Sequence, residues 1–576
     1  MQRYFLVLIE TSSNQEYIFA TNKLKENIGA SELTYQAGTQ WVLQAIAEET
    51  GQSPLGVWSG VARLRNQLRN PTLNPPIEAS STIVEILTAA SGKALLLTKK
   101  EASAKSIISF VTRQALINAP GLDVCGVYVP IEDWEGDGSL AEAVKSAHEL
   151  FESVRTLRPS PQQRFLRLPI ISNCSTSGFP ASKLETLSNA QLSEGGQAKP
   201  ISLISEIKRQ SSSNAKQRLI ELDKRLAPQI DGIINNEFEP EPSSWLGIVH
   251  ADGNGLGQIF LRFGDYPSNQ SSRNYVQTYR DFSLSLDECT EAAFKKALEK
   301  IFSEQRNTIP LVPLILGGDD LTVICDGHYA LEFSREFLLA FEQQTTQNPT
   351  IASIAQHFFG VERLSACAGI AIVKRHFPFS IAYNLAEQLI KSAKSVKELV
   401  QCDDSVDMPE KTPVPCSAID FHILYDSVRV ELADIRERLQ PEPETKLFNR
   451  PYVVTEATLL QNARLSGQIW ADRHRWKLLS DRVSWLTDKQ AEDALPSSQY
   501  HALRKSLYLG QAAADSQYNL ICQRYGLDQY AESSEETGSE SPSLFFEDIE
   551  GKATTFLDAL DAKDFLHRDD MEPVNP

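Results

Sequence analysis

The chain is poor in the features that mark zinc-thiolate, disulfide-rich or membrane proteins. Its 576 residues include 8 cysteines, and no two of them are spaced as CxxC. Neither a zinc ribbon nor a disulfide framework is therefore supported. No segment approaches 18 uninterrupted apolar residues, and the N-terminal MQRYFLVLIETSS is too short for a span and has no small-residue cleavage pattern. We expect a soluble, cytoplasmic protein without a membrane partner.

Basic charge is also scarce. Lys and Arg number 56 against 75 Asp and Glu, which gives a formal net charge of −19. A broad basic footprint for nucleic acid is thus excluded for the chain as a whole, and any RNA contact has to be local or shared with other subunits. An apolar content of 41% suffices for several cores, and the length allows three or four domains of ~150 residues.

One stretch, LVPLILGGDDLTVICDG at 311–327, combines an apolar strand, two glycines, two adjacent aspartates and a second apolar strand. Glycine pairs favour tight hairpin turns, so Gly317 and Gly318 predict a turn. Asp319 and Asp320 follow where the second strand begins, although aspartate is depleted in strands. Two carboxylates ~4 Å apart repel by roughly 4 kcal/mol at an effective dielectric constant of 20. A divalent cation removes that penalty; taken alone, the motif is better explained as a solvated turn.

A second turn carries an acid as well. Residues 245–260, WLGIVHADGNGLGQIF, form an apolar run that ends in Asp252, followed by a loop with Gly253, Asn254, Gly255 and Gly257. Such a loop predicts a metal ligand beside backbone amides that approach a phosphate chain. Asp252, Asp319 and Asp320 have no nearby Cys or His in this interpretation, which favours Mg²⁺ or Mn²⁺ over zinc.

The elements around these turns predict a palm. Apolar spacing indicates helices at 287–302 and 329–341 and a strand at 364–373. The order is the split βαβ arrangement of a ferredoxin-like domain. In that fold Asp252 and the tip of the hairpin lie on neighbouring strands, so we expect the three aspartates to converge.

The first 135 residues repeat this plan, with strands at 4–11, 81–89, 94–99 and 125–131. Aligning Phe19 with Phe260 places Thr11 at the position of Asp252 and Ser13 at that of Asn254. The turn Ser91-Gly92-Lys93 then stands where Gly318-Asp319-Asp320 stands. We interpret this as an internal duplication in which only the second copy keeps the acids; a coincidental repeat of the same element order is the alternative.

The predicted fold class is α+β, with two ferredoxin-like palm domains and helical inter-palm and C-terminal domains. The expected domains are a non-catalytic first palm, a helical and loop-rich inter-palm domain, a second palm and a helical C-terminal domain; their ranges are 1–135, 136–243, 244–400 and 401–576. A Pro/Glu boundary at 237–245 precedes the second palm, and an acidic linker lies near 531–543.

A helix expected at 381–397 carries Lys391 and Lys394, which are candidate contacts for a triphosphate. Ordinary solvated lysines are the alternative for both. The predicted nucleotide-binding set is completed by the two turn glycines and four residues of the first loop: Gly317, Gly318, Gly253, Asn254, Gly255 and Gly257.

These residues resemble a known family. The segments ADGNGLG, LGGDD, AGIAIV and AEQLIKSAK, and the N-terminal NQEYIFATNKLKENIGASEL, are similar to the large polymerase–cyclase subunit of type III CRISPR effector complexes, the Cas-ten family, over nearly the full chain. The resemblance implies synthesis of cyclic oligoadenylates from ATP when a guide RNA pairs with a foreign transcript. The partners would be the other complex subunits, guide RNA and target RNA. Asp252, Asp319 and Asp320 would be metal ligands, Lys394 a triphosphate contact, and the first palm a holder of the acceptor ATP.

Three departures qualify the resemblance. The chain starts directly at the first palm, so we expect no N-terminal histidine–aspartate nuclease. The cysteine pairs that bind zinc between the palms of some members are missing, and Cys174 alone stands in that region. Asn254 occupies the place of a second aspartate in many members. A stand-alone nucleotide cyclase and a catalytically silent scaffold remain the alternatives.

Overall fold

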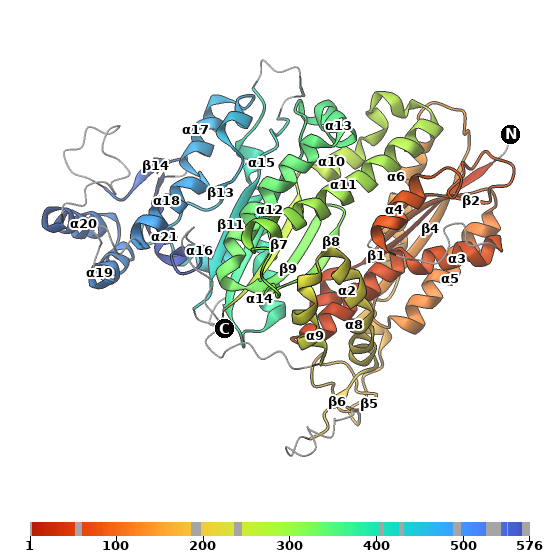
Figure 1. Ribbon diagram of the computed structural model, residues 1–576, viewed down its shortest axis with the longest axis horizontal. Helices are drawn as coiled ribbons and strands as arrows, with labels where there is room; N and C mark the ends of the chain where they lie inside the picture. The colour runs from red at the N-terminus through yellow and green to blue at the C-terminus, as the bar shows by residue number, and fades with distance from the viewer. Residues whose placement is uncertain are drawn as a thin grey trace.

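A computed structural model gives the fold (Figure 1). The structure describes residues 3–51, 60–90, 92–185, 197–235, 245–403, 408–409, 411–425, 431–487, 497–525, 543–549 and 551–566. In Figure 1 the chain runs from the first palm on the right, through the second palm in the middle, to the C-terminal elements on the left.

The first palm has an antiparallel four-stranded sheet in the order β2-β3-β1-β4. This is the ferredoxin-like order, because the first strand lies between the third and the fourth. Apolar runs such as YFLVLIETS form strands here because they are covered on both faces. The elements are β1 (Tyr4–Ser12), α1 (Asn14–Phe19), α2 (Leu24–Gly38), α3 (Gln40–Thr50), α4 (Val61–Arg69), β2 (Val84–Ala90), β3 (Lys93–Thr98), α5 (Glu101–Asn118) and β4 (Asp123–Ile131).

The second palm repeats this order as β10-β7-β9-β8. The predicted fold class, with two ferredoxin-like palms, is therefore confirmed. The long helix begins well before the predicted residue 287. The elements are β7 (Trp245–Gly253), α10 (Leu256–Leu261), η3 (Phe263–Asp265), η4 (Pro267–Gln270), α11 (Ser272–Ile301), β8 (Leu311–Gly317), β9 (Asp320–Asp326), α12 (Gly327–Gln347), α13 (Pro349–Phe359), β10 (Ala366–Lys374), α14 (Phe379–Ala393) and α15 (Val396–Leu399).

The sheet of the second palm continues beyond residue 400. Strand β11 pairs in parallel with β10, and β13 pairs with β11, so the prediction of a purely helical region after this point is wrong. The elements are β11 (Ala418–Ile423), α16 (Leu432–Arg438), β12 (Thr445–Lys446), β13 (Tyr452–Val453), η5 (Ala457–Leu460), α17 (Leu465–Arg473), α18 (Trp476–Thr487), α19 (Ser497–Leu507), α20 (Gln511–Tyr525), β14 (Phe546–Asp548), β15 (Gly551–Ala553) and α21 (Phe556–Ala562). The acidic linker at 531–543 lies outside the described residues except for its last position.

The inter-palm region is helical with a small two-stranded sheet that projects from the body at the bottom of Figure 1. Most of the predicted boundary at 237–245 lies outside the described residues. The elements are α6 (Ser139–Leu157), η1 (Pro161–Arg164), β5 (Lys183–Leu184), β6 (Pro200–Ile201), α8 (Leu203–Leu222), η2 (Lys224–Leu226) and α9 (Ala227–Asn235).

Each palm covers the hairpin edge of the other. Helix α2 of the first palm lies against β8, and the Ser31 hydroxyl donates to the carbonyl of Leu314. Helix α11 of the second palm lies against β2, and the Arg280 guanidinium donates to the carbonyl of Ile86 at 3.1 Å. Because the exchange is reciprocal, the two hairpin turns face a common space between the palms.

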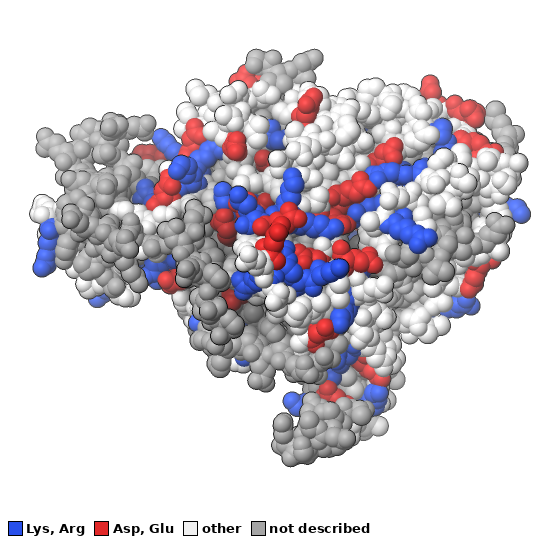
Figure 2. Space-filling view, viewed as in Figure 1, with Lys and Arg blue, Asp and Glu red and all other residues white. Residues whose placement is uncertain are grey.

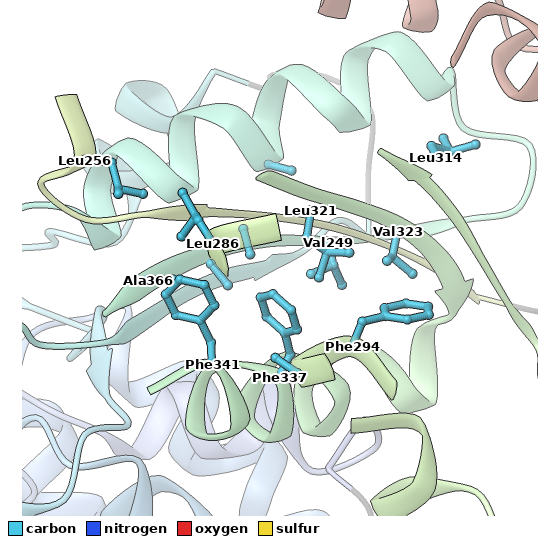
Figure 3. Close-up of a cluster of buried hydrophobic side chains, with 14 of the residues drawn as sticks. Val249, Leu256, Leu286, Phe294, Leu314, Leu321, Val323, Phe337, Phe341 and Ala366 are labelled. Carbon is cyan, nitrogen blue, oxygen red and sulfur yellow. The ribbon is translucent and has the colours of Figure 1, made fainter. Parts of the chain in front are cut away.

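The core below the second sheet fixes which side chains face that space. Val249, Leu321 and Val323 pack against Phe294 of α11 and Phe337 of α12, all of them buried (Figure 3). Because successive side chains of a strand alternate between its faces, the even-numbered residues of β7 and β9 point away from these helices. The acids of both strands therefore lie on the opposite face, toward α14.

Helix α14 is seated on that face by one glycine. A Cβ at Gly369 of β10 would lie 2.1 Å from the carbonyl oxygen of Ala386, so a larger side chain would push the helix off the sheet. This close approach fixes the distance between the sheet and α14, whose C-terminal end lies near the aspartates.

The duplication holds, but the predicted alignment is off by one residue. Glu10 lies opposite Lys93 in the first palm as Asp252 lies opposite Asp320 in the second. Ser13 corresponds to Gly255, since both are left-handed residues that precede a short helix. Thr11 and Ser13 are thus not the counterparts of Asp252 and Asn254. The predicted turn keeps its place at Gly92 and Lys93, while Ser91 lies outside the described residues.

Candidate active site

The structure brings the three aspartates together. Asp252 at the end of β7 lies directly opposite Asp320, the first residue of β9. Asp319 occupies the turn between β8 and β9. It lies so close to Gly253 that a Cβ on Gly253 would be 2.9 Å from the Cβ of Asp319. Gly318, at φ +64, makes this turn possible, because side chains other than glycine are strained in that region. The predicted convergence is confirmed.

A lysine holds one of the acids. The ammonium group of Lys394, at the end of α14, donates to a carboxylate oxygen of Asp252 and to the carbonyl oxygen of Gly253 at 3.2 Å. The ammonium group of Lys394 therefore lies between a carboxylate oxygen and a carbonyl oxygen, beside the aspartates. Lys391 lies elsewhere: its side chain is 69% exposed and pairs with Glu387 on the helix surface at 2.8 Å.

Burial and neighbouring carboxyls raise the pKa of Asp319 and Asp320. The pKa of Asp319 is raised well above its usual range, first by partial burial and then by the adjacent Asp252 carboxyl. The pKa of Asp320 rises to about 6, chiefly through burial and the charge of Asp252, against the opposing effects of His250 and Lys394. One oxygen of Asp320, Oδ1, is buried without a hydrogen-bond partner. Such an oxygen is costly to leave unpaired and is suited to a cation.

A histidine at this site was missed from the sequence. The buried ring of His250 lies with Nδ1 3.1 Å from the hydroxyl of Thr322 and 3.5 Å from Oδ1 of Asp320. The sequence carried the signal, since residues two apart on a strand share a face and His250 precedes Asp252 by two. The expectation that no His lies near the acids is therefore wrong.

The glycine loop serves the fold more than the cavity. The Asn254 side chain is buried and donates to Ser365, Cys367 and the carbonyl of Cys416, while its backbone N–H donates to Ser365. Asn254 is therefore not presented to a nucleotide. Gly255 begins α10 in the left-handed conformation, and Gly257 has open space around it.

A cavity of about 1150 Å³ separates the palms. The second palm contributes Gly317, Gly318, Asp319 and Asp320, and the first contributes Thr11, Ser13, Gly92 and Lys93. Asp252 and residues 253–257 do not line this cavity. Sites for one small molecule typically measure ~300–1,000 Å³, so this cavity lies slightly above the upper end of that range.

The donor set fits a hard cation, but no cage is preformed. Across the described ranges, no group of three or more His, Cys, Asp or Glu side chains is arranged to hold a metal ion. Carboxylate oxygens are nevertheless the ligands that Mg²⁺ and Mn²⁺ prefer, and Asp320 Oδ1 lacks a partner. Asp252, Asp319 and Asp320 are the side chains that would supply oxygen ligands to such an ion, and in this structure Lys394 is paired with Asp252.

The surface agrees with the charge balance. Figure 2 shows acidic and basic side chains interleaved across the middle of one face rather than a broad basic patch. Among the helices that the structure describes, none is both long and apolar enough to cross a bilayer.

The segment that carries this geometry matches a known domain. Residues 245–399 match the family model described as Cas10/Cmr2, second palm domain. This segment resembles the Cas10/Cmr2 second palm. The resemblance to the Cas-ten family is thereby confirmed for residues 245–399, with the GGDD turn and the loop after Asp252 both inside that segment. No curated protein sequence matches the chain at a significant level.

Solved structures resemble the chain more distantly. A chain of the apo type III-B Cmr-beta complex is 10% identical, with a TM-score of 0.49 over 97% of this chain and 81% of that one. A Csm1–Csm4 cassette in complex with cA3 is 12% identical, with a TM-score of 0.44 over 94% and 68%. The cassette with AMPPNP is 12% identical, with a TM-score of 0.38, and this chain spans 53% of its length. These likenesses carry no weight beside the strand order and the Cas10/Cmr2 match.

Proposed function

We propose that the protein converts ATP into cyclic oligoadenylates in a reaction that requires Mg²⁺ or Mn²⁺, as the large subunit of a type III CRISPR effector complex. One observation carries the proposal: Asp252, Asp319 and Asp320 converge within a segment that matches the Cas10/Cmr2 second palm, beside a cavity of about 1150 Å³ between the palms. Other complex subunits, guide RNA, target RNA and a cytoplasmic location belong to the same proposal. Solved Csm1–Csm4 cassettes are described with ATP, pppApA, cA3 and cA4, and the proposal extends ligands of this class to this chain.

The residues divide the task. Asp252, Asp319 and Asp320 would hold the metal ion, which when bound lowers the barrier to attack of a 3′-hydroxyl on an α-phosphate. Lys394 would leave Asp252 and contact the triphosphate, since its ammonium group lies within reach of the same oxygens. The first palm, which presents Lys93 to the cavity, would hold a second nucleotide.

A silent scaffold is the second candidate. The ammonium group of Lys394 neutralises Asp252, and the described residues contain no preformed metal cage. Both features suit a palm retained for its shape alone. The difference between the two candidates is whether ATP is turned over.

The deciding experiment incubates the purified protein, with whatever co-purifies, with radiolabelled ATP and Mg²⁺, and separates the products by chromatography. We expect cyclic adenylates that disappear in the variant Asp319→Ala/Asp320→Ala. The control Asp481→Ala removes an exposed carboxylate that pairs with Lys477 on α18 and should leave the products unchanged. Absence of turnover with guide and target RNA present would support the scaffold. A short RNA in the purified sample distinguishes a complex subunit from a stand-alone cyclase.

A further inference from the structure

The tip of the GGDD turn is held from outside its own hairpin. The backbone N–H of Gly318 donates to Oδ1 of Asp287 at 3.0 Å, and the hydroxyl of Thr290 donates to the carbonyl oxygen of Gly318 at 2.5 Å. Asp287 and Thr290 are three residues apart on α11, so they share a face of the helix. We call this pair the hairpin clamp. It holds both backbone polar groups of the residue that precedes Asp319.

The clamp is connected to the first palm. Nε of Arg65, on α4, donates to Oδ2 of Asp287 at 2.6 Å, and the same guanidinium bonds Glu291 at 2.7 Å. The side chains of Arg65 and Asp287 are 8% and 15% exposed. A charge-assisted hydrogen bond in such a setting fixes the orientation of the carboxylate. Arg65 therefore orients the oxygen that Gly318 uses.

The turn of the first palm has no such connection to the other palm among the described residues. The carbonyl oxygen of Gly92 accepts hydrogen bonds from the backbone N–H of Thr11 at 2.8 Å and from its hydroxyl at 3.1 Å. Both donors belong to the neighbouring strand of the same palm. Among the described residues of the two turns, hydrogen bonds that cross the palm interface at Arg65 reach the turn that bears the aspartates through Asp287.

We propose that Arg65, Asp287 and Thr290 are positioning residues that set the place of Asp319 and Asp320 and make it depend on how the two palms are docked. This inference rests on the proposed function. Arg65, Asp287 and Gly318 all line the cavity between the palms. Asp319 and Asp320 line the same cavity.

The chain supplies its own matched control. Arg69 pairs with Glu288 at 2.5 Å, one helical turn along α4 from Arg65. This ion pair also joins α4 to α11, but it makes no hydrogen bond to the hairpin among those of the described residues. If the inter-palm ion pairs only stabilise the fold, changing either pair has the same consequence.

The test compares Asp287→Ala and Thr290→Val with Glu288→Ala in the full complex, and measures kcat and KM for ATP together with hydrogen exchange of the peptide 311–326. We expect kcat to fall by about 10- to 100-fold for the clamp variants, as mispositioned groups cause, with KM for ATP within about twofold and faster exchange of the hairpin. Thr290→Ser keeps the hydroxyl and should restore wild-type values. If Asp287→Ala fails to fold, Thr290→Val carries the test by itself, because it removes the other hydrogen bond of the clamp.

Equal kcat values for the clamp variants and Glu288→Ala, in a complex whose wild type is active, would overturn the inference. So would unchanged hydrogen exchange at the hairpin. If the wild type makes no product, the proposed function fails by itself, and the exchange measurement still decides whether the clamp holds the turn.

Discussion

The two palms share a strand order and a strand register, and differ in charge at one pair of positions. Asp252 faces Asp320 in the second palm, whereas Glu10 faces Lys93 in the first. Lys93 lies 3.5 Å from Glu10 and 3.0 Å from the ring of His148, so its pair is neutralised within the palm. The acids of the second palm repel one another and depend on Lys394. The same pair of strand positions therefore holds opposite charges in the first palm and two carboxyls, which favour a bound cation, in the second palm.

The largest expected effect is on ATP turnover, which we expect to depend on the carboxylate of the second palm and not on that of the first. Asp320→Asn removes a charged ligand from the proposed metal site, and we expect ATP turnover to fall by at least ~10²-fold, as for loss of a group that stabilises a transition state. Glu10→Gln is the matched change in the first palm and should alter turnover by no more than a few-fold. Steady-state assays of both variants measure this. Equal losses would mean that the two palms contribute alike.

The second effect is a pH dependence of metal binding. Since the pKa of Asp320 is raised to about 6 and that of Asp319 is also raised, both must lose protons before they bind a cation. We expect Mn²⁺ affinity to fall at least about tenfold between pH 7 and pH 5. Titration followed by electron paramagnetic resonance measures the affinity. An affinity that does not change over this pH range would show that Asp319 and Asp320, whose pKa values are raised, are not the ligands.

The third effect concerns the two lysines of the α14 region. Lys394→Met removes the cation nearest the aspartates, and we expect KM for ATP to rise about tenfold, the value of one charge-assisted hydrogen bond. Lys391→Met removes an exposed lysine that pairs with Glu387 and should change KM by less than twofold. Initial-rate kinetics decide this. A larger rise in KM for Lys391→Met than for Lys394→Met would show that Lys391, and not Lys394, contacts the triphosphate.

The smallest effect is on stability, with opposite signs in the two palms. A carboxyl whose pKa is raised by folding makes the native state more stable below pH 4 than above pH 6, so ionised Asp320 destabilises the fold at neutral pH. Asp320→Asn should therefore raise Tm by about 2–4 °C at pH 7.5 and leave it unchanged below pH 4. Glu10→Gln breaks an attractive pair and should lower Tm at pH 7.5. Thermal unfolding without metal measures both.

Much of this comparison could be predicted from the sequence. The order of apolar runs and turns gave both palms, and strand topology alone placed Asp252 beside the GGDD turn. The residue-by-residue alignment of the two palms could not be predicted, because matching Phe19 with Phe260 ignores the strand pairing of Glu10 with Lys93. The partners of individual side chains could not be predicted either. Asn254 turns into the core toward Cys416, a contact 162 residues away along the chain.

The sheet extension shows a different limit. Strand β11 is six residues long and joins the sheet only because β10 offers it a free edge. A short apolar run does not reveal its partner, so sequence patterns could not place it. The hairpin clamp and its connection to the first palm were also hidden from the sequence. Asp287 and Gly318 are 31 residues apart, and Arg65 and Asp287 are 222 residues apart.

The most direct test is a structure of the complex with a non-hydrolysable ATP analogue and Mn²⁺, in which anomalous scattering locates the metal. The account predicts manganese in contact with Asp252 and Asp320, Lys394 moved onto the phosphates, and no manganese beside Glu10 and Lys93. Nucleotide bound in the cavity with manganese at the first palm, or with Lys394 still paired to Asp252 and no metal present, would contradict it.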